Sequence, residues 1–433
     1  MSTKWAVVGG GMLGLSLARR LRAQGRDVTL IESAPFLGGL ASAWRLGDIV
    51  WDRHYHVTLL SDSYTRGEFR ALGLDDDVQW VETKTGYYAD GVLSSVSNSV
   101  EFLRLPSLSL VDKARLATTI LYGSRVKNWR ALEQESVETW LRKWSGARTF
   151  ERFWLPLLRA KLGESYRDAS AAFIWATIQR LYAARNSGLK KEMFGYVPGG
   201  YARILDTYAK ILDASGVRLE VGRRVTSITR QGFAVEVAWD GGSETFDHVV
   251  VTANPGVAAR LCPELPEADR GRLAAIGYQG IVCTSLILTK PLSPYYLTYI
   301  TDDSPVTAVV EMTAFVDRSE FGGRSLVYLP KYVGRDDPLF DRPDDEVEAT
   351  AVDTLGRMYP GFRPGHVEAA RVSRVREVFP IPVLDYSTRV PPVDTPIPGV
   401  HLVNSAQIVN GTLNVNDTVR LAEEAARRFA SLP

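Results

Sequence analysis

The sequence predicts a mixed α/β fold, in which one α/β domain is interleaved with a second domain made of a mixed sheet and a helical insertion. Three observations predict it. An apolar run near the amino terminus leads through a glycine turn into a helical pattern, helix-forming and aromatic residues dominate about residues 100–195, and strand-like alternation returns afterwards. With 433 residues, the chain exceeds the roughly 250–300 residues at which one core stops growing, which favours two domains.

The first predicted unit is a strand, a helix and a second strand. KWAVVGG is an apolar run that ends in glycines, as a buried strand does. Apolar positions then recur at helical spacing, at Met12, Leu15, Ala18 and Leu21, up to Gly25. DVTLIE follows as the second buried strand. Together these segments form a unit of about 30 residues, the size expected for half of a dinucleotide-binding domain.

Helical and strand patterns alternate through the rest of the chain. Residues 100–195 show wide apolar helical faces, whose aromatic residues, such as Trp140 and Trp154, are mostly expected in the core. VPGGYARILDTYAKILDASGVRLEVGRRVTSI then predicts a helix from about Tyr201 to Asp213, followed by strands. We expect further strands in AVEVAW, DHVVVTA, IVCTSLILT, TAVVEM, SLVYLP and GVHLVNS, and helices in DDEVEATAVDTLGRMY and DTVRLAEEAARRFA.

Composition excludes several classes of partner. The 51 basic and 50 acidic residues leave a net charge of +1, which argues against a nucleic-acid partner and an electrostatic membrane tether. The two cysteines, Cys262 and Cys283, form no disulfide framework and lack metal-ligand spacing, so we expect a reducing compartment and no metal site. We see no secretory signal and no apolar run of about 18 residues, and we expect a cytoplasmic protein.

A glycine pattern with a later carboxylate predicts a bound dinucleotide. Gly9, Gly11 and Gly14 fit G-x-G-x-x-G directly after a strand and at the start of a helix. In this pattern the glycines allow a tight turn, a close approach of backbone to a pyrophosphate, and close packing of helix on strand. Glu32 ends the second strand 18 residues after Gly14, where a carboxylate accepts hydrogen bonds from ribose hydroxyls. Ser33 follows in place of an arginine, which argues against a 2′-phosphate.

A second glycine pair indicates which dinucleotide. Gly38 and Gly39 lie six residues past Glu32, and a loop without Cβ atoms can run close beside the ligand. The combined pattern, G-x-G-x-x-G…E-x5-G-G, resembles the opening of the FAD-dependent amine oxidase superfamily, which includes protoporphyrinogen oxidases, phytoene desaturases and other flavin desaturases. The resemblance implies a Rossmann-like FAD-binding domain. It assigns residues 1–70, 196–262 and 386–433 to that domain, and residues 71–195 and 263–385 to the substrate-binding domain.

Later segments extend the resemblance over most of the chain. WLPLLRAKLGESYRDASAAFIWATIQRL is similar to the helical part of protoporphyrinogen-oxidase-like proteins. GVRLEVGRRVTSI looks like the segment whose backbone meets the adenine, here at Val225, and FDHVVVTANP looks like the strand and crossover that follow. GVHLVNSAQIVNGTLNVNDTVRLAEEAA occupies the place of the carboxy-terminal flavin motif. The usual Gly-Asp pair of that motif is replaced by Asn404 and Ser405, so other groups must make the expected contact.

The end of this motif carries further implied flavin contacts. Asn414, Asn416 and Asp417 resemble the Asn/Asp-rich ending of bacterial polysaccharide- and lipid-cluster oxidases and, more distantly, of UDP-galactopyranose mutases. By this resemblance, helix N–H groups after Asp417 face the pyrimidine edge of the flavin. Several amine oxidases attach their flavin to a cysteine near the motif. This sequence has none there, which implies non-covalent FAD.

The segment WDRHYHV, residues 51–57, is the best candidate for catalytic side chains. It follows the first flavin-binding unit, where the chain of the superfamily passes the isoalloxazine ring. On an extended strand, His54 and His56 share one face and Tyr55 points the other way. The histidines are then flavin contacts or proton acceptors, or structural residues. The lysine that many amine oxidases place near N5 is missing from GIVCTSLIL. Lys331 on another strand is either a replacement for it or, as we favour, a solvated lysine at a strand end.

The resemblance implies an FAD-dependent oxidoreductase that dehydrogenates a hydrophobic or polycyclic small molecule of the isoprenoid, porphyrinogen or lipid-linked class. Hydride passes to flavin N5, and oxygen or a quinone accepts the electrons. One alternative is a flavin isomerase like UDP-galactopyranose mutase, without net redox change. It requires arginines near the ring, and the chain offers Arg159, Arg180, Arg185 and Arg374.

A second alternative to the dehydrogenase is a non-catalytic FAD-binding protein, because intact glycine motifs indicate cofactor binding and nothing more. Peripheral membrane contact is a separate open point, since LYGSRVKNW carries Arg125, Lys127 and Arg130, which are able to meet lipid headgroups. The sequence does not indicate an oligomeric state.

Overall fold

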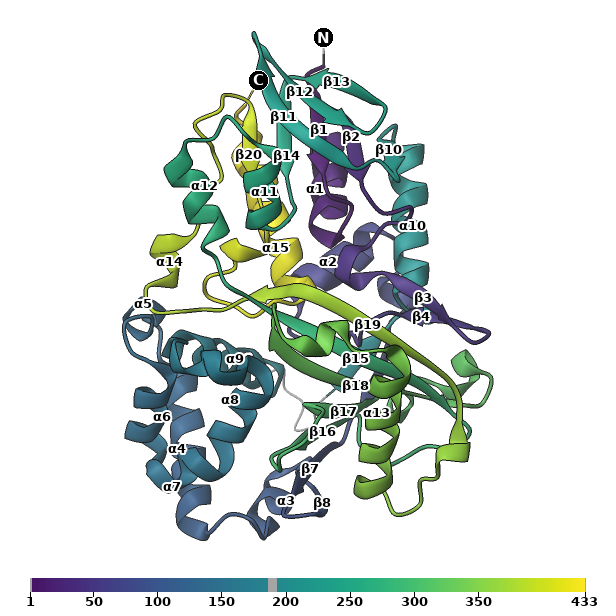
Figure 1. The fold of residues 1–433 in the computed structure, drawn as a ribbon, viewed down its shortest axis with the longest axis vertical. Helices are drawn as coiled ribbons and strands as arrows, with labels where there is room; N and C mark the ends of the chain where they lie inside the picture. The colour runs from purple at the N-terminus through teal and green to yellow at the C-terminus, as the bar shows by residue number, and fades with distance from the viewer. Residues whose placement is uncertain (1, 186–192, 433) are drawn as a thin grey trace.

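A five-stranded parallel sheet lies toward the top of the molecule in Figure 1. The computed structural model describes residues 2–185 and 193–432. In spatial order the strands are β10 (Arg218–Val221), β2 (Asp27–Glu32), β1 (Lys4–Val8), β14 (His248–Val251) and β20 (Val400–Leu402). Because side chains alternate along a strand, Val7 enters one hydrophobic core while Ala6 and Val8 enter another on the opposite face.

Different layers cover the two faces of this sheet. The helices on one face are α1 (Met12–Ala23), α2 (Ser63–Ala71), α10 (Gly200–Ala214) and α15 (Val415–Phe429). The elements on the other face are β11 (Val225–Gln231), β12 (Ala234–Trp239), β13 (Gly242–Phe246), α11 (Pro255–Leu261) and α12 (Glu267–Ala274). The sheet is therefore buried on both sides, which explains the continuous apolar runs of its strands.

A seven-stranded mixed sheet forms the centre of the molecule. In spatial order its strands are β19 (Val367–Pro380), β15 (Tyr278–Leu288), β18 (Ser325–Gly334), β17 (Ala308–Glu311), β16 (Leu297–Ile300), β7 (Thr85–Ala89) and β8 (Val92–Ser95). Only the β16–β7 pair is parallel among the described strands of this sheet. We call the face that carries Tyr328 and Tyr332 the inner face, and the face covered by α13 (Asp344–Met358) the outer face.

The helical insertion packs against the inner face. Its helices are α3 (Ser99–Arg104), α4 (Leu110–Arg125), α5 (Trp129–Leu132), α6 (Val137–Ser145), α7 (Ala147–Thr149), a π-helical turn (Phe150–Trp154), α8 (Leu155–Leu162) and α9 (Ala171–Arg185). Trp140, Phe150 and Trp154 are buried in one core with Tyr328 and Tyr332. No helix in the described part of the chain is long and apolar enough to cross a membrane.

Short elements connect the two large sheets. They are the hairpin β3 (Ala43–Leu46) and β4 (Ile49–Asp52), the small sheet of β5 (Thr58–Leu59), β9 (Met193–Tyr196) and β6 (Gln79–Glu82), and α14 (Tyr386–Arg389). The hairpin joins the core on the inner face, where the ring centroids of Trp51 and of Phe321, in the turn before β18, lie 4.8 Å apart. This contact brings the segment after the second glycine loop against the mixed sheet.

The predicted mixed α/β fold is confirmed, with two local corrections. The strand that we predicted through both histidines ends at Asp52, so His54 and His56 lie in an irregular segment. Helix α15 begins at Val415, before the predicted start at Asp417, because Asn414 caps it. The two-domain boundaries remain a proposal, which the distribution of strands between the two sheets supports.

Glu311 is a buried carboxyl group that holds one turn of the mixed sheet. It ends β17 with 1% exposure, and its carboxylate accepts hydrogen bonds from the N–H groups of Leu292, at 3.1 Å, and Ser293, at 3.0 Å. Burial outweighs these hydrogen bonds and raises the pKa of Glu311 from its ordinary 4.5 to about 7. The folded protein therefore binds a proton here more tightly than the unfolded chain does.

This raised pKa predicts a pH dependence of stability. Between about pH 4.5 and pH 7 the folded state holds more protons than the unfolded state, so the contribution of Glu311 to the free energy of unfolding falls as pH rises. Across this window the wild type should lose on the order of 3 kcal/mol of its free energy of unfolding. Glu311→Gln keeps an oxygen acceptor but does not titrate, so we expect it to remove this loss. Urea unfolding at several pH values measures it. Glu267→Gln, at an exposed position, is the control, and identical slopes for Glu311→Gln and the wild type would contradict the prediction.

Candidate cofactor and active site

Two glycine loops meet at the carboxyl ends of β1 and β2. Gly38 pairs with Gly11 in an isolated bridge, and its N–H donates to the Gly10 carbonyl at 2.8 Å. A Cβ on Gly14 would lie 1.9 Å from the Gly9 carbonyl oxygen, so α1 packs on the turn only because residue 14 is glycine. Gly9, at φ +118°, adopts a backbone conformation that favours glycine. The structure therefore brings together the predicted glycines of both loops, including Gly39.

The first turn of α1 has the properties of an anion site. Gly11 precedes the helix and offers no side-chain cap, and the first turn contains no acidic residue. A Cβ on Gly11 would meet only the backbone of residues 38–39, at an ordinary 4.0 Å, and its φ of −74° suits any residue. Nothing in the protein itself therefore requires glycine at position 11. A pyrophosphate that approaches the helix N–H groups would require it, so this cradle fits a dinucleotide.

Glu32 lies beside this cradle with acceptor capacity to spare. One carboxylate oxygen accepts the Gly10 N–H at 2.6 Å, and the other accepts the Ala34 N–H at 2.7 Å and the Ser33 hydroxyl at 3.1 Å. A carboxylate offers about four acceptor positions, which leaves one for a ribose hydroxyl. The Glu32 carbonyl accepts the N–H of Arg223 at 2.9 Å, so the segment leading to Val225 runs next to it.

The carboxy-terminal motif contains an orphaned buried donor. Asn404 is completely buried, and its Oδ1 accepts the Ala406 N–H at 3.1 Å, at the turn that begins with Ser405. Its Nδ2 has no partner among the described residues. A buried donor without an acceptor is costly, so this amide also fits a bound polar ligand.

The other predicted residues of this motif already stabilise the fold. Asn414 Oδ1 accepts the Asp417 N–H at 2.9 Å, and Asn416 Oδ1 accepts the N–H of Tyr64 at 2.9 Å at the start of α2. The Thr418 N–H donates to the Asn414 carbonyl at 3.1 Å inside the helix. The expectation that N–H groups after Asp417 face a flavin is therefore wrong, because the helix begins earlier and uses them.

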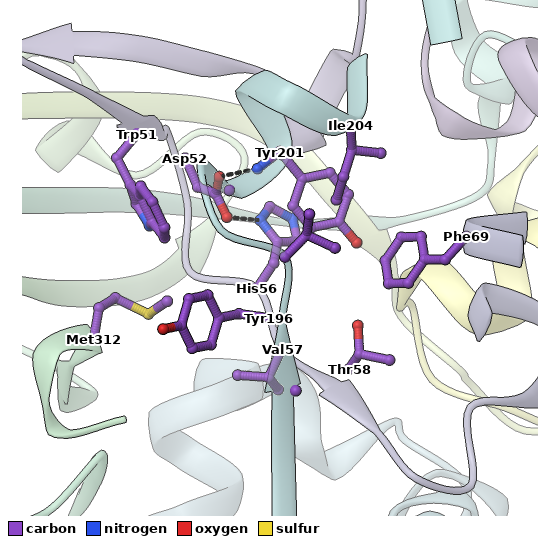
Figure 2. A pocket seen from close by; sticks show the side chains of 13 residues that line it. Trp51, Asp52, His56, Val57, Thr58, Phe69, Tyr196, Tyr201, Ile204 and Met312 are labelled. Atoms are coloured by element: carbon purple, nitrogen blue, oxygen red, sulfur yellow. Dashed lines mark hydrogen bonds and ion pairs between the residues drawn. The ribbon is translucent and has the colours of Figure 1, made fainter. Parts of the chain in front are cut away.

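Asp52 and His56 line a small cavity between β4 and α10. The Asp52 carboxylate is buried, accepts the Tyr201 N–H at 2.7 Å and lies 3.6 Å from His56 Nδ1, as the dashed lines in Figure 2 show. The second distance is in the range of an ion pair but too long for a hydrogen bond. The cavity, also lined by Phe69 and Met312, has a volume of about 10 Å3, which is room for about one water molecule.

His54 lies in a different environment from His56. It is buried, and its Nε2 lies 3.2 Å from the hydroxyl of Ser373 on β19. Burial, with smaller contributions from His56 and Arg53, lowers the pKa of His54 to about 3. The imidazole is therefore uncharged at neutral pH and is a poor proton acceptor there.

Tyr55 points to the inner face of the mixed sheet. Its hydroxyl lies 2.9 Å from the hydroxyl of Tyr332, and burial raises the pKa of Tyr55 well above its ordinary value. The Lys161 ammonium, from α8, lies 3.5 Å from the centroid of the Tyr332 ring and 4.9 Å from that of Phe379. A cation from the helical insertion is thus held on aromatic rings of the sheet.

Sequence analysis missed Asp52 and Lys161. Asp52 had a usable signal, since it lies four residues before His56 in the same segment. Lys161 had none, because its contacts with β18 and β19 join residues far apart in the chain. Lys331, expected as an alternative near the ring, points instead to the outer face, where its Nζ donates to the Ser304 carbonyl at 2.8 Å.

The described arginines that we considered for a mutase form ion pairs with carboxylates of this chain. Arg159 pairs with Glu164 at 2.9 Å, and Arg180 pairs with Asp62 at 3.3 Å. Arg374 pairs with the Asp344 carboxylate. The side chain of Arg185 lies outside the described residues.

Comparison with known proteins agrees with the cofactor cradle described above. Residues 13–429 match the family described as flavin containing amine oxidoreductase. The chain is 27% identical over 222 residues to the zeta-carotene desaturase of Zea mays, a match that covers 46% of this chain and 39% of that protein. It spans about half or less of the length of the curated relatives it matches.

Solved structures share the fold. A candidate protoporphyrinogen oxidase from Exiguobacterium sp. 255-15 superposes with a TM-score of 0.77 at 16% identity, over 99% of both chains. Reduced UDP-galactopyranose mutase superposes with a TM-score of 0.76 at 14% identity, over 100% of this chain and 96% of the other. At such low identity these likenesses establish the fold alone.

The open space at Gly11 predicts a selective loss of cofactor binding. We expect Gly11→Ala to fold as stably as the wild type, because its Cβ meets no close atom, and to bind FAD at least about tenfold more weakly, because the methyl group occupies the approach of the pyrophosphate. FAD titration followed by protein fluorescence measures the affinity.

Gly67→Ala provides the matched control. Gly67 lies inside α2 with no atom within 4 Å of a built Cβ, so the same substitution should leave FAD affinity unchanged and raise stability by about 0.5–1 kcal/mol. Equal FAD affinity in the Gly11→Ala protein and the wild type would show that the cradle does not hold the pyrophosphate.

Proposed function

The chain belongs to the flavin containing amine oxidoreductase family, and we propose that it is an FAD-dependent oxidoreductase that dehydrogenates a hydrophobic or polycyclic small molecule. The observation that carries this proposal is the aromatic inner face. Tyr55, Tyr328, Tyr332 and Phe379 gather there, next to the hairpin that follows the second glycine loop. Aromatic and apolar side chains like these suit a site for substrates of the isoprenoid, porphyrinogen or lipid-linked class.

The proposed cofactor contacts follow the cradle. Gly9, Gly11 and Gly14 would hold the pyrophosphate with the first turn of α1, Glu32 would bind the ribose, and the segment at Val225 would meet the adenine. Gly38 and Gly39 would run beside the dinucleotide. From the carboxy-terminal turn, Asn404 Nδ2 and Ser405 would offer donors, while Asn414, Asn416 and Asp417 would keep that turn in place through the hydrogen bonds they already make.

We propose that FAD is held non-covalently. Neither cysteine lies in the carboxy-terminal motif, and both side chains are buried. Burial raises the pKa of Cys262 and that of Cys283 to about 12, so both thiols stay protonated at neutral pH and are poor nucleophiles.

His56 is the proposed proton acceptor. Bound FAD supplies the hydride acceptor at N5, and oxygen or a quinone takes the electron pair afterwards. As the substrate C–H bond breaks and hydride leaves, a proton must leave the neighbouring atom for a base. His56 suits this role because its Nδ1 lies 3.6 Å from the Asp52 carboxylate, which would orient the ring. His54 and Tyr55 would instead help to hold the inner face in place, His54 through its contact with Ser373 and Tyr55 through its contact with Tyr332.

The assignment of His56 as the base predicts how fast the substrate reduces the bound flavin. Mixed anaerobically with its substrate, the FAD-loaded protein should lose its visible flavin absorbance, and we expect His56→Gln to slow that bleaching by at least about 100-fold, since the base is removed. Stopped-flow absorbance measures the rate. A linear isoprenoid, a porphyrinogen and a lipid-linked compound form the test panel.

His366→Gln is the matched control, because His366 ends a surface turn before β19 and should react at the wild-type rate. Unchanged bleaching in His56→Gln would remove His56 from the reaction. A flavin spectrum that none of the three compounds bleaches would contradict the dehydrogenase proposal. Isomerisation of a sugar nucleotide by the reduced protein would favour the mutase alternative, and ligand release without any turnover would favour a non-catalytic binding protein.

Peripheral membrane contact is proposed through the tip of the helical insertion. Exposed apolar side chains gather around α3 and the start of α4, where Leu110 is 74% exposed and Val111 62%. Val100 and Leu103 are each 56% exposed nearby in the chain. The basic residues expected to meet lipid lie at the opposite end, since α4 separates Leu110 from Arg125 by about 22 Å.

The apolar tip predicts vesicle binding. Two exposed side chains that enter the interface contribute up to about 1.5–3 kcal/mol each, so Leu110→Asp with Val111→Asp should weaken binding at least about tenfold. Sedimentation with phosphatidylcholine vesicles containing phosphatidylglycerol measures it. Phe233→Asp, at a 97% exposed position in the turn between β11 and β12, should bind as the wild type does. Equal sedimentation of the double variant and the wild type would rule out this tip as the contact.

A further inference from the structure

A second cavity lies on the outer face of the mixed sheet, between β15, β18 and α13, three elements that adjoin in Figure 1. Its volume is about 240 Å3. Leu329, Lys331 and Val333 of β18 line it, whereas their neighbours Tyr328 and Tyr332 point to the inner face. The thickness of the sheet therefore separates this cavity from the candidate active site.

Most of the cavity wall is apolar. Val282 of β15 and Leu329 and Val333 of β18 form one side, and Val347 and Ala351 of α13 form the other. An apolar cavity of about 150 Å3 in another protein accepts benzene. This one is large enough for a longer hydrocarbon group.

One end of the cavity carries a partly buried cation. Lys331 is partly buried, and its Nζ donates to the Ser304 carbonyl at 2.8 Å, which leaves two of its three N–H donors. Burial lowers the pKa of Lys331, and the carboxylates of Asp303 and Asp337 oppose that shift. Neither carboxylate forms an ion pair with the ammonium in the part of the chain that the structure describes.

The remaining charged groups at the lining favour an anionic ligand. Asp337 uses one carboxylate oxygen to accept the Leu339 N–H at 2.8 Å, and Arg342 adds a second cation at the exposed side. The lining therefore contains two cations and one carboxylate. A ligand that brings its own negative charge would satisfy the free donors of Lys331 while its hydrocarbon part covers the apolar wall.

We propose that this outer cavity binds a small amphipathic carboxylate, with the carboxylate on Lys331 and the hydrocarbon chain between the sheet and α13. The site is independent of the proposed flavin chemistry, because no residue of the cofactor cradle or of the inner face lines it. It would persist if the proposed reaction were wrong.

Octanoate is the probe for this site, and isothermal titration calorimetry of the FAD-loaded protein is the measurement. We expect octanoate to bind at least tenfold more tightly than 1-octanol, which has the same chain without the charge. Lys331→Met, which removes the ammonium and keeps an apolar side chain, should weaken octanoate binding at least tenfold. Lys290→Met, at an exposed position two residues after β15, should leave it unchanged.

Two cavity-filling variants locate the bound probe. Ala351→Leu fills the cavity from the buried side of α13, and Thr350→Leu does so from a partly exposed position with less risk to folding. Loss of octanoate binding in either folded variant supports the proposal. It is overturned if octanoate binds both variants or Lys331→Met as it binds the wild type, if it does not bind the wild type, or if it shifts the visible flavin spectrum, which would place it on the inner face.

Discussion

The buried carboxylate of Asp52 is the group on which the arrangement of the candidate active site depends. A carboxylate with 2% exposure is costly unless it is hydrogen-bonded or paired, and here it accepts the Tyr201 N–H at 2.7 Å and lies 3.6 Å from His56 Nδ1. The backbone carbonyl of the same residue accepts the Tyr328 hydroxyl at 2.5 Å. Asp52 thus joins the β3–β4 hairpin to α10 and to the mixed sheet, and it positions His56 at their meeting point.

The sequence was sufficient to predict those features of the cofactor site that depend on the local backbone. The glycines of both loops and Glu32 are recognisable because backbone conformation and close approach restrict those positions to few residue types. The start of α15 was misplaced because Asn414 and Asp417 are both good helix caps, and only the structure shows which one accepts the N–H. Lys161 could not have been found, because its cation–π contacts depend on how α8 packs on two distant strands.

The fold leaves the reaction undecided, since proteins named for different substrates superpose on this chain almost equally well. The deciding features are the side chains of the inner face. The described arginines considered for a diphosphate are paired with carboxylates of this chain, and releasing one would cost its ion pair. On the aromatic inner face, the ammonium of Lys161 already rests on the Tyr332 ring. An apolar substrate therefore disturbs the fewest existing interactions.

Strand β18 contributes to both the aromatic inner face and the outer cavity, because its side chains alternate between the two faces of the sheet. Tyr332 meets Tyr55 on the inner face, and its neighbour Lys331 enters the outer cavity. The backbones of β18 and β15 would separate a ligand on the outer face from the candidate active site. β18 pairs with β15 in continuous register from Ser325 to Gly334, and its side chains are buried in the cores on both faces of the sheet. Sliding β18 along β15 would therefore break many hydrogen bonds at once. Binding on the two faces should therefore be energetically independent unless the whole sheet shifts as one unit.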